Sequence, residues 1–154
     1  METLNKDSTE IFCGLIALLK EEKRIDFKIP ALMDLYFERT EETFTTPLGD
    51  AKKYILAHSY RIGKKTFHSP YMSFIVTNNC TPELRAKNLA GIYPFIYTGH
   101  TDLSVCGLIM NQNKIDGCLP AVLRYHINYA AGWLSALQAK GWINEEMILR
   151  TKNK

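Results

Sequence analysis

"KYILAHSYRIGKKTFHSPYMSFIVT", residues 53–77, decides the fold because two runs rich in apolar and aromatic residues surround a single glycine. In the first run, from Tyr54 to Ile62, every second residue except His58 is apolar or aromatic, as in a strand, although part of the run also fits helical spacing. We interpret it as a strand. Gly63 suits a turn, and residues 71–77 alternate before a β-branched end, as a returning strand would. The stretch therefore predicts a β-hairpin with a basic tip.

Two helices are predicted before this hairpin. Apolar residues recur with helical spacing over residues 11–19, and Asp7 with Glu10 three places later resembles a capping box. Pro30 suits a first helical position, and apolar side chains continue on one face after it. Residues 30–42, PALMDLYFERTEE, are therefore predicted to form a second, short helix.

After the hairpin, helix and strand signals alternate. Thr81 followed by Pro-Glu is a strong N-cap signal, so residues 82–90 are predicted to form a helix of about two turns that ends at Gly91. Residues 92–98, IYPFIYT, and residues 103–110, LSVCGLIM, are predicted strands, and the NQNK that follows is a predicted turn.

The longest predicted helix runs from Pro120 to Lys140. Its apolar stripe consists of Leu123, Ile127, Ala130, Leu134 and Leu137. Gly141 followed by Trp142 fits a left-handed cap with its hydrophobic contact, and Asn144 is expected to cap a last turn. We therefore expect an α+β fold: a small, mostly antiparallel sheet packed by the N-terminal helices and one long C-terminal helix.

Length and composition favour one soluble domain over residues 1–154. The net charge of +3 is lower than a dedicated nucleic-acid-binding domain usually carries. The apolar run at residues 11–19 lies between Glu10 and Lys20, so it is too short to span a bilayer and lacks the start of a signal peptide. We expect a cytoplasmic protein with no membrane partner. The sequence is compatible with either a monomer or a homo-oligomer.

Four cysteines are spread along the chain without the short spacing of a zinc site. They are Cys13, Cys80, Cys106 and Cys118, and they lie largely in apolar surroundings. The pattern is typical of reduced, buried thiols rather than of a disulfide framework.

Two stretches carry a family resemblance. The first holds His58, Pro70, Met72 and Phe74, and the second holds Trp133, Leu134, Leu137, Gly141 and Trp142. In this spacing they resemble a family of uncharacterised bacterial proteins, often carried on plasmids, phages and other mobile elements. The signature of that family runs His, then Asp-Pro-Glu-Met-x-Phe, then a late Trp-Leu-x-Asn-Ile-x-x-Gln-Gly-Phe. The resemblance covers residues 54–143 and implies an α+β fold and a mobile-element setting.

The departures from that signature bear on function. The family's acidic positions are Ser69 and Tyr71 in this chain, and Lys64 follows Gly63 where an Asp is usual. Chemistry that depends on those acids is therefore in doubt here, and the resemblance implies no particular activity.

The segment YTGHTD, residues 97–102, holds the densest set of reactive side chains. His100 and Asp102 could form a general base and the carboxylate that orients it, with Tyr97, His58 or His68 brought near by the sheet. The alternative is a turn in which Asp102 and its neighbour bond local backbone amides. We favour the turn and leave the catalytic residues unassigned.

Four histidines from separate predicted elements offer a second route to a site. His58, His68, His100 and His126 could converge on a metal ion, but a sequence cannot display that convergence. His126 lies beside the apolar stripe of the long helix, where a hydrogen-bonded core histidine is the commoner outcome. We expect no metal and no cofactor.

The predicted hairpin offers a binding surface. Its cations and aromatic residues interleave, as in surfaces that meet phosphates and stack bases; the candidates are Lys53, Tyr60, Arg61, Lys64, Lys65 and Phe67. The alternative is an ordinary edge hairpin whose lysines prevent pairing with other sheets. We expect a small accessory protein that binds a protein or nucleic-acid partner without catalysis; the alternative is a hydrolase or metal enzyme centred on His100 and Asp102.

Overall fold

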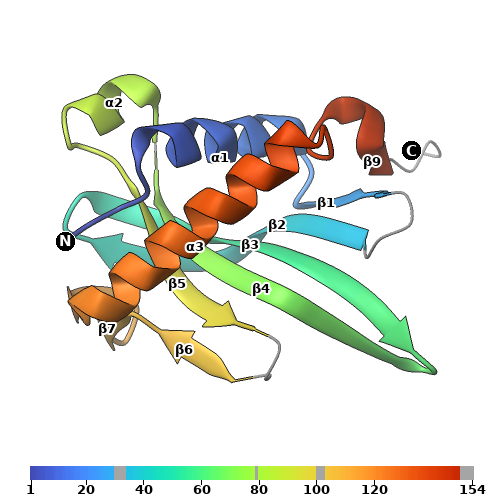
Figure 1. Ribbon diagram of the computed structural model, residues 1–154. Helices are drawn as coiled ribbons and strands as arrows, with labels where there is room; N and C mark the ends of the chain where they lie inside the picture. The colour runs from blue at the N-terminus through green and yellow to red at the C-terminus, as the bar shows by residue number, and fades with distance from the viewer. Residues whose placement is uncertain (30–33, 79, 100–102, 150–154) are drawn as a thin grey trace.

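Strands dominate the structure. The computed structural model describes residues 1–29, 34–78, 80–99 and 103–149 of the chain. Within these residues it contains three α-helices and nine strands that belong to one sheet (Figure 1). The predicted α+β class is confirmed, although the sheet is larger than the small one expected.

The first predicted helix is α1, Lys6–Leu19. Its N-cap is Asn5, whose side chain accepts a hydrogen bond from the Ser8 amide at 2.8 Å, so the cap lies two residues before the predicted Asp7. The buried face of α1 includes Phe12. Its ring packs edge to face against the rings of Phe37 and Phe74, with ring centres 5.2 and 4.8 Å apart.

The predicted second helix is wrong. After β1, Arg24–Phe27, the described part of that segment belongs to β2, Asp34–Thr46. β2 pairs with β1 on one side and with the following strand on the other. Leu35 and Phe37 are fully buried on one face while Tyr36 between them points to the other, so the period of two outweighs the helical spacing.

The predicted hairpin is confirmed and is longer than expected. It consists of β3, Gly49–Ile62, and β4, Lys65–Thr77, which pair antiparallel along nearly their whole length. Gly63 lies in the turn with a φ of +63°, a conformation that favours glycine. In Figure 1 the tip of this hairpin projects beyond the rest of the sheet.

The helix predicted at residues 82–90 is shorter than expected. α2, Pro82–Ala86, begins at Thr81, whose hydroxyl accepts from the Leu84 amide at 3.2 Å, as predicted. The chain leaves the helix early because Asn88, rather than Gly91, adopts the left-handed conformation, and the Leu89 amide then bonds the Leu84 carbonyl at 2.8 Å. The strand β5, Ile92–Thr98, follows as predicted.

The strand predicted at residues 103–110 divides at Gly107 into β6, Ser104–Cys106, and β7, Leu108–Asn111. After the predicted turn, β8, Lys114–Cys118, returns beside β7, and no pattern in the sequence indicated it. A Cβ on Gly107 would lie 3.0 Å from the Leu123 amide nitrogen, so this glycine allows the strand to approach a helix closely.

The long C-terminal helix is confirmed as α3, Pro120–Ala139, with its predicted stripe buried. Gly141 has a φ of +69°, and the Trp142 amide bonds the Leu137 carbonyl at 3.1 Å, which is the predicted left-handed cap. Asn144 caps a 3₁₀ turn, η1, Glu145–Met147, before β9, Ile148–Leu149. None of the helices in the described ranges has the length and apolar character needed to cross a membrane.

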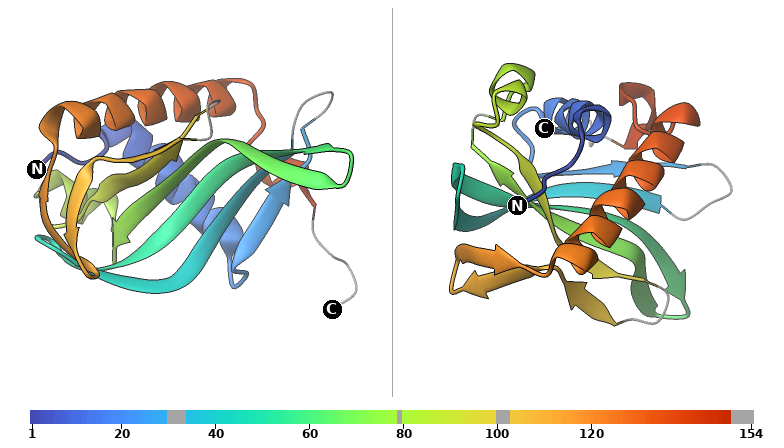
Figure 2. Two further views of the ribbon diagram at one scale, coloured as in Figure 1. Left: turned by 90° about the horizontal axis from the view of Figure 1, so that it is seen from below. Right: turned by 60° about the vertical axis from the view of Figure 1, so that its left-hand side comes forward.

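In the described part of the chain, helices cover one face of the sheet and no helix covers the other. The strand order is β6-β5-β4-β3-β2-β1-β9. α1 packs on one face through Phe12. On that same face, the ring centres of Trp133 of α3 and His58 of β3 are 5.9 Å apart. Figure 2 shows α3 running along one side of the curved sheet. We call these two faces the helix-covered face and the helix-free face.

The sheet curls toward the helix-free face at the end where β7 and β8 lie. Phe44 of β2 and Phe95 of β5 contact edge to face at 5.6 Å, although β3 and β4 lie between their strands. Three strand spacings in a flat sheet amount to about 14 Å, so only a curled sheet allows this contact. β8 extends the curl because it pairs with β2 at Thr45, parallel to it. The helix-free face is therefore concave at this end.

Candidate functional site

The two faces of the sheet separate the described catalytic candidates. Tyr97 of β5 lies on the helix-covered face, where its ring contacts those of Tyr129 and His126 at 4.6 and 5.6 Å. His68 of β4 lies on the helix-free face, edge to face with Tyr36 at 5.4 Å. These two side chains therefore face different sides of the sheet.

His100 and Asp102, which carry the catalytic hypothesis, lie outside the described residues with Thr101. The catalytic interpretation and the turn interpretation both stay predictions. Among the described residues, no three His, Cys, Asp or Glu side chains are grouped closely enough to hold a metal ion.

His126 is a core residue, as its position beside the apolar stripe indicated. Its side chain is 1% exposed, and burial lowers its pKa because the charged imidazolium would lose its hydration. The Nδ1 atom is buried and has no hydrogen-bond partner within the described part of the chain, which differs from the hydrogen-bonded histidine that we expected.

The tip of the β3–β4 hairpin brings three of the predicted binding residues together. Arg61, Lys64 and Lys65 are exposed, and the ion pairs of the described residues involve none of them. We call these three side chains the basic tip. Just below it, the rings of Tyr60 and Phe67 stack at 5.4 Å, and the Lys65 ammonium lies 5.0 Å from the Phe67 ring centre. The aromatic pair thus stabilises the hairpin itself.

Lys53, the remaining predicted binding residue, lies apart from the basic tip. It is near the other end of β3, and its ammonium pairs with the Glu42 carboxylate at 2.8 Å. Its side chain is only 15% exposed. Lys53 therefore does not share a surface with Arg61, Lys64 and Lys65.

A groove of about 470 Å³ lies at the base of the hairpin, and no pattern in the sequence indicated it directly. Its lining residues come from β4, β5 and β6: Lys65, Thr66, Phe67, His68, Tyr71, Ile96, Thr98 and Ser104. Among the residues that the structure describes, this lining contains hydroxyl groups, one lysine and one histidine, and no carboxylate. The groove therefore suits a ligand with acceptor groups or negative charge.

The centre of the helix-free face is more mixed in charge. Burial raises the pKa of Tyr71, and the carboxylates of Glu38 and Glu42 raise it further. Burial likewise raises the pKa of Tyr36 to about 12, while the Arg24 guanidinium, 4.0 Å from the ring centre, opposes that rise. Both phenols are neutral donors at physiological pH. The preference for an anion therefore belongs to the hairpin end of this face.

The groove borders β6, which is the last strand at its end of the sheet within the described residues. On the helix-free side of β6, the Ser104 hydroxyl lies 2.8 Å from that of Thr98. On the helix-covered side, Val105 is paired with Tyr97 and is 43% exposed. Tyr125 of α3 also contacts the Tyr97 ring, at 6.4 Å, and is 59% exposed. The edge of β6 thus has an apolar side and a polar side.

Sequence reasoning missed the groove because the groove forms only when segments distant in the sequence pair in the sheet. His68 and Tyr71 of β4 meet Thr98 of β5 only through the register of the sheet. The available signal that β2 is a strand was its content of aromatic and β-branched residues, which include Tyr36, Phe37, Thr43, Phe44, Thr45 and Thr46.

Comparison with known proteins finds no matching family model, no similar curated protein and no similar solved structure. The family resemblance of residues 54–143 therefore stays a hypothesis.

Proposed function

We propose that this protein is a small, non-catalytic accessory protein of the cytoplasm that holds an extended, acidic segment of a partner protein along the edge of β6. The observation that carries the proposal is the edge of β6 next to the groove, which no other described strand pairs, with exposed Val105 on one side and Ser104 on the other. The four free cysteines support a reducing compartment.

An edge strand offers backbone N–H and C=O groups that a partner chain can bond in the plane of the sheet. Side chains of the added strand would then alternate between the two faces. On the helix-covered side they meet Val105 and Tyr125, which favours apolar residues. On the helix-free side they meet the groove with Lys65 and His68, which favours carboxylates. The proposed partner segment therefore alternates apolar and acidic residues.

The aromatic and apolar side chains around the groove support a protein segment over a nucleic acid as the ligand. The rings of Tyr60 and Phe67 stack on each other, and Lys65 lies over Phe67, so these rings are engaged within the hairpin rather than open to bases. The exposed apolar side chains beside β6, Leu103 at 70% and Val105 at 43%, match apolar side chains better than phosphates.

The test is a binding titration with a short fluorescent peptide in which Val and Glu alternate, followed by anisotropy. We expect saturable binding that is lost on replacing Glu by Lys in the peptide. Val105→Lys should weaken binding at least about tenfold, because it places an unpaired charge against the apolar side of the added strand. Leu149→Lys is the matched control, since Leu149 is 58% exposed on β9 at the opposite end of the sheet.

Two outcomes would count against this proposal. If Val105→Lys and Leu149→Lys bind the peptide equally well, the edge of β6 is not the site. If the wild-type protein binds an oligothymidine strand at low salt and does not bind the peptide, the ligand is a nucleic acid. Light scattering at the same concentrations shows whether a second copy of the chain occupies the edge instead.

A further inference from the structure

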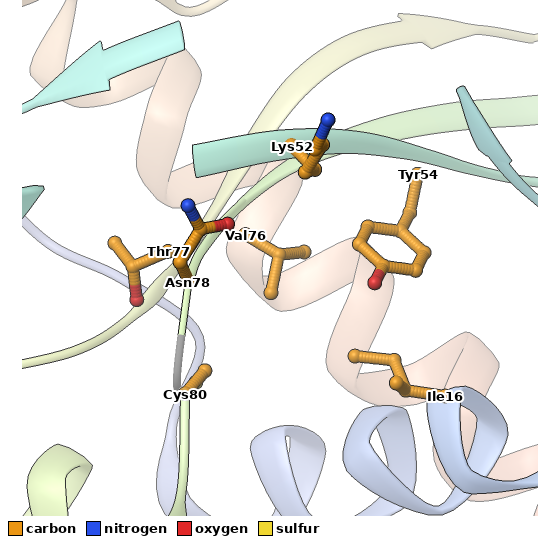
Figure 3. Close-up of a pocket in the computed structure, with 7 residues that line it drawn as sticks. All are labelled: Ile16, Lys52, Tyr54, Val76, Thr77, Asn78 and Cys80. Carbon is orange, nitrogen blue, oxygen red and sulfur yellow. The ribbon is translucent and has the colours of Figure 1, made fainter. Parts of the chain in front are cut away.

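A second cleft, away from the β6 edge, lies between α1 and the adjoining ends of β3 and β4. Its volume is about 590 Å³. Figure 3 shows its lining residues: Ile16 from α1, Lys52 and Tyr54 from β3, Val76 and Thr77 from the end of β4, and Asn78 and Cys80 from the segment after it. A small polar solute that enters this cleft reaches Cys80.

Cys80 has a second thiol beside it. Cys13 of α1 lies 67 positions earlier in the chain, and its sulfur donates a hydrogen bond to the Cys80 carbonyl oxygen at 3.9 Å. The Cys13 thiol thus lies directly against Cys80. Both cysteines are half-buried, and of the two only Cys80 is among the described residues that line the cleft.

The surroundings of the pair favour a thiolate at Cys80. The hydrogen bond from the Cys13 thiol lowers the pKa of Cys80 to about 7, with help from the Thr77 hydroxyl and the Arg85 guanidinium and against the effect of burial. The same hydrogen bond and burial raise the pKa of Cys13, which therefore stays protonated. Arg85 is held in place because its guanidinium donates to the Leu4 carbonyl at 2.6 Å.

We propose that Cys80 and Cys13 form a peroxide-reactive dithiol site in which Cys80 is the attacking thiolate and Cys13 the resolving thiol. The Cys80 sulfur attacks one oxygen of a hydroperoxide, the O–O bond breaks, and the leaving alkoxide or hydroxide takes up a proton. Cys80 becomes a sulfenic acid. The Cys13 sulfur then attacks the Cys80 sulfur, the S–O bond breaks, and water leaves with the Cys13 proton. The peroxide is reduced by two electrons, and a Cys13–Cys80 disulfide forms.

The consequence of the disulfide is a covalent link between α1 and the segment before α2. In the reduced protein these elements are joined by non-covalent contacts, including the hydrogen bond from the Cys13 thiol to the Cys80 carbonyl. Because the cleft is distinct from the groove beside β6, this inference does not depend on the proposed function.

The experiment treats the reduced, full-length protein with hydrogen peroxide and follows each cysteine by mass spectrometry after alkylation. We expect the wild type to lose two free thiols and to yield a Cys13–Cys80 cross-linked peptide that dithiothreitol reverses. Cys13→Ser should instead accumulate a sulfenic acid at Cys80 that dimedone traps. Iodoacetamide should alkylate Cys80 with a rate midpoint near pH 7, where such a thiol is about 15-fold more ionised than an ordinary cysteine.

Cys106→Ser and Cys118→Ser are the matched controls, because both residues are half-buried free cysteines in other parts of the sheet. Each should leave formation of the Cys13–Cys80 cross-link unchanged. The proposal is overturned if Cys80→Ser leaves the rate of peroxide consumption unchanged, or if Cys106 or Cys118 is oxidised before Cys80. A cross-link that forms at the same rate at pH 6 and about pH 8 would also overturn it, since a thiolate mechanism requires the rate to rise with pH.

Discussion

At the residue scale, His126 shows how burial changes the behaviour of a titratable side chain. It is 1% exposed on α3 and packs against the ring of Tyr97, and burial lowers its pKa. In the unfolded chain the imidazole regains an ordinary pKa near 6.5. Below that pH the unfolded state binds more protons than the folded state, so stability falls as the pH falls.

We expect His126→Phe to remove this part of the pH dependence. Phenylalanine keeps a planar ring and deletes a buried Nδ1 that has no partner among the described residues. The free energy of unfolding at about pH 7.5 should change by less than about 1 kcal/mol. Between about pH 6.5 and pH 5 the wild type should lose more stability than the variant, because only the wild type has a buried imidazole with a lowered pKa. Urea unfolding at both ends of this range measures the difference, and equal slopes for the two proteins would exclude the effect.

At the element scale, the sequence predicted the elements whose local signals agree and failed where two signals competed. The periodic apolar stripe on α3, the Thr81 cap next to Pro82 and the turn at Gly63 between two strand patterns are each present. For residues 30–42, Pro30 and the apolar side chains after it suggested a helix. Pairing with β1 and β3 on both sides decided the outcome, because it satisfies the backbone groups of the strand.

Gly107 is the point where one predicted strand becomes two. A Cβ there would lie 3.0 Å from the Leu123 nitrogen and 3.1 Å from its Cα, both backbone atoms of α3. We expect Gly107→Ala to destabilise the protein by about 1–3 kcal/mol, because either the strand or the helix must shift. Gly117→Ala on neighbouring β8 is the control. Its Cβ would meet Ile109 at an ordinary 3.7 Å, so the change should stay under about 1 kcal/mol.

Thermal and urea unfolding of both glycine variants measure this comparison. If Gly107→Ala and Gly117→Ala lower the stability equally, the cause is a general cost of adding a side chain near β7 and β8. The close approach of β6 and β7 to α3 would then not explain the loss. Such a result would contradict the packing at Gly107.

At the scale of the whole molecule, the candidate site depends on distances that the sequence does not encode locally. The basic tip was predictable, because Arg61, Lys64 and Lys65 surround one turn. The groove was not, because Tyr71 and Ser104 belong to strands that meet only when β5 pairs on both sides. The pairing of Cys13 with Cys80 across 67 positions was hidden for the same reason. Contacts of this kind follow from the register of the complete sheet.

The basic tip also dominates the net charge of the molecule. Replacing Arg61, Lys64 and Lys65 by Ala removes the whole formal net charge of +3. The three side chains are exposed and form no ion pair within the described residues, so the variant should fold with an unchanged circular dichroism spectrum. The control removes the same charge from the helix ends, by Lys6→Ala, Lys87→Ala and Lys140→Ala.

We expect the tip variant, and not the control, to bind the alternating acidic peptide more weakly. Three exposed charge pairs at about 0.2–1 kcal/mol each correspond to an increase in Kd between about threefold and a hundredfold at low salt. At about 0.5 M salt the Debye length falls to about 4 Å, so wild type and variant should converge. If the ligand is a nucleic acid, removing each cation that binds a phosphate should instead shallow the log–log salt slope by about one unit. A Kd that is equal for wild type and tip variant across the salt titration would remove the basic tip from the binding surface and leave the edge of β6 to act alone.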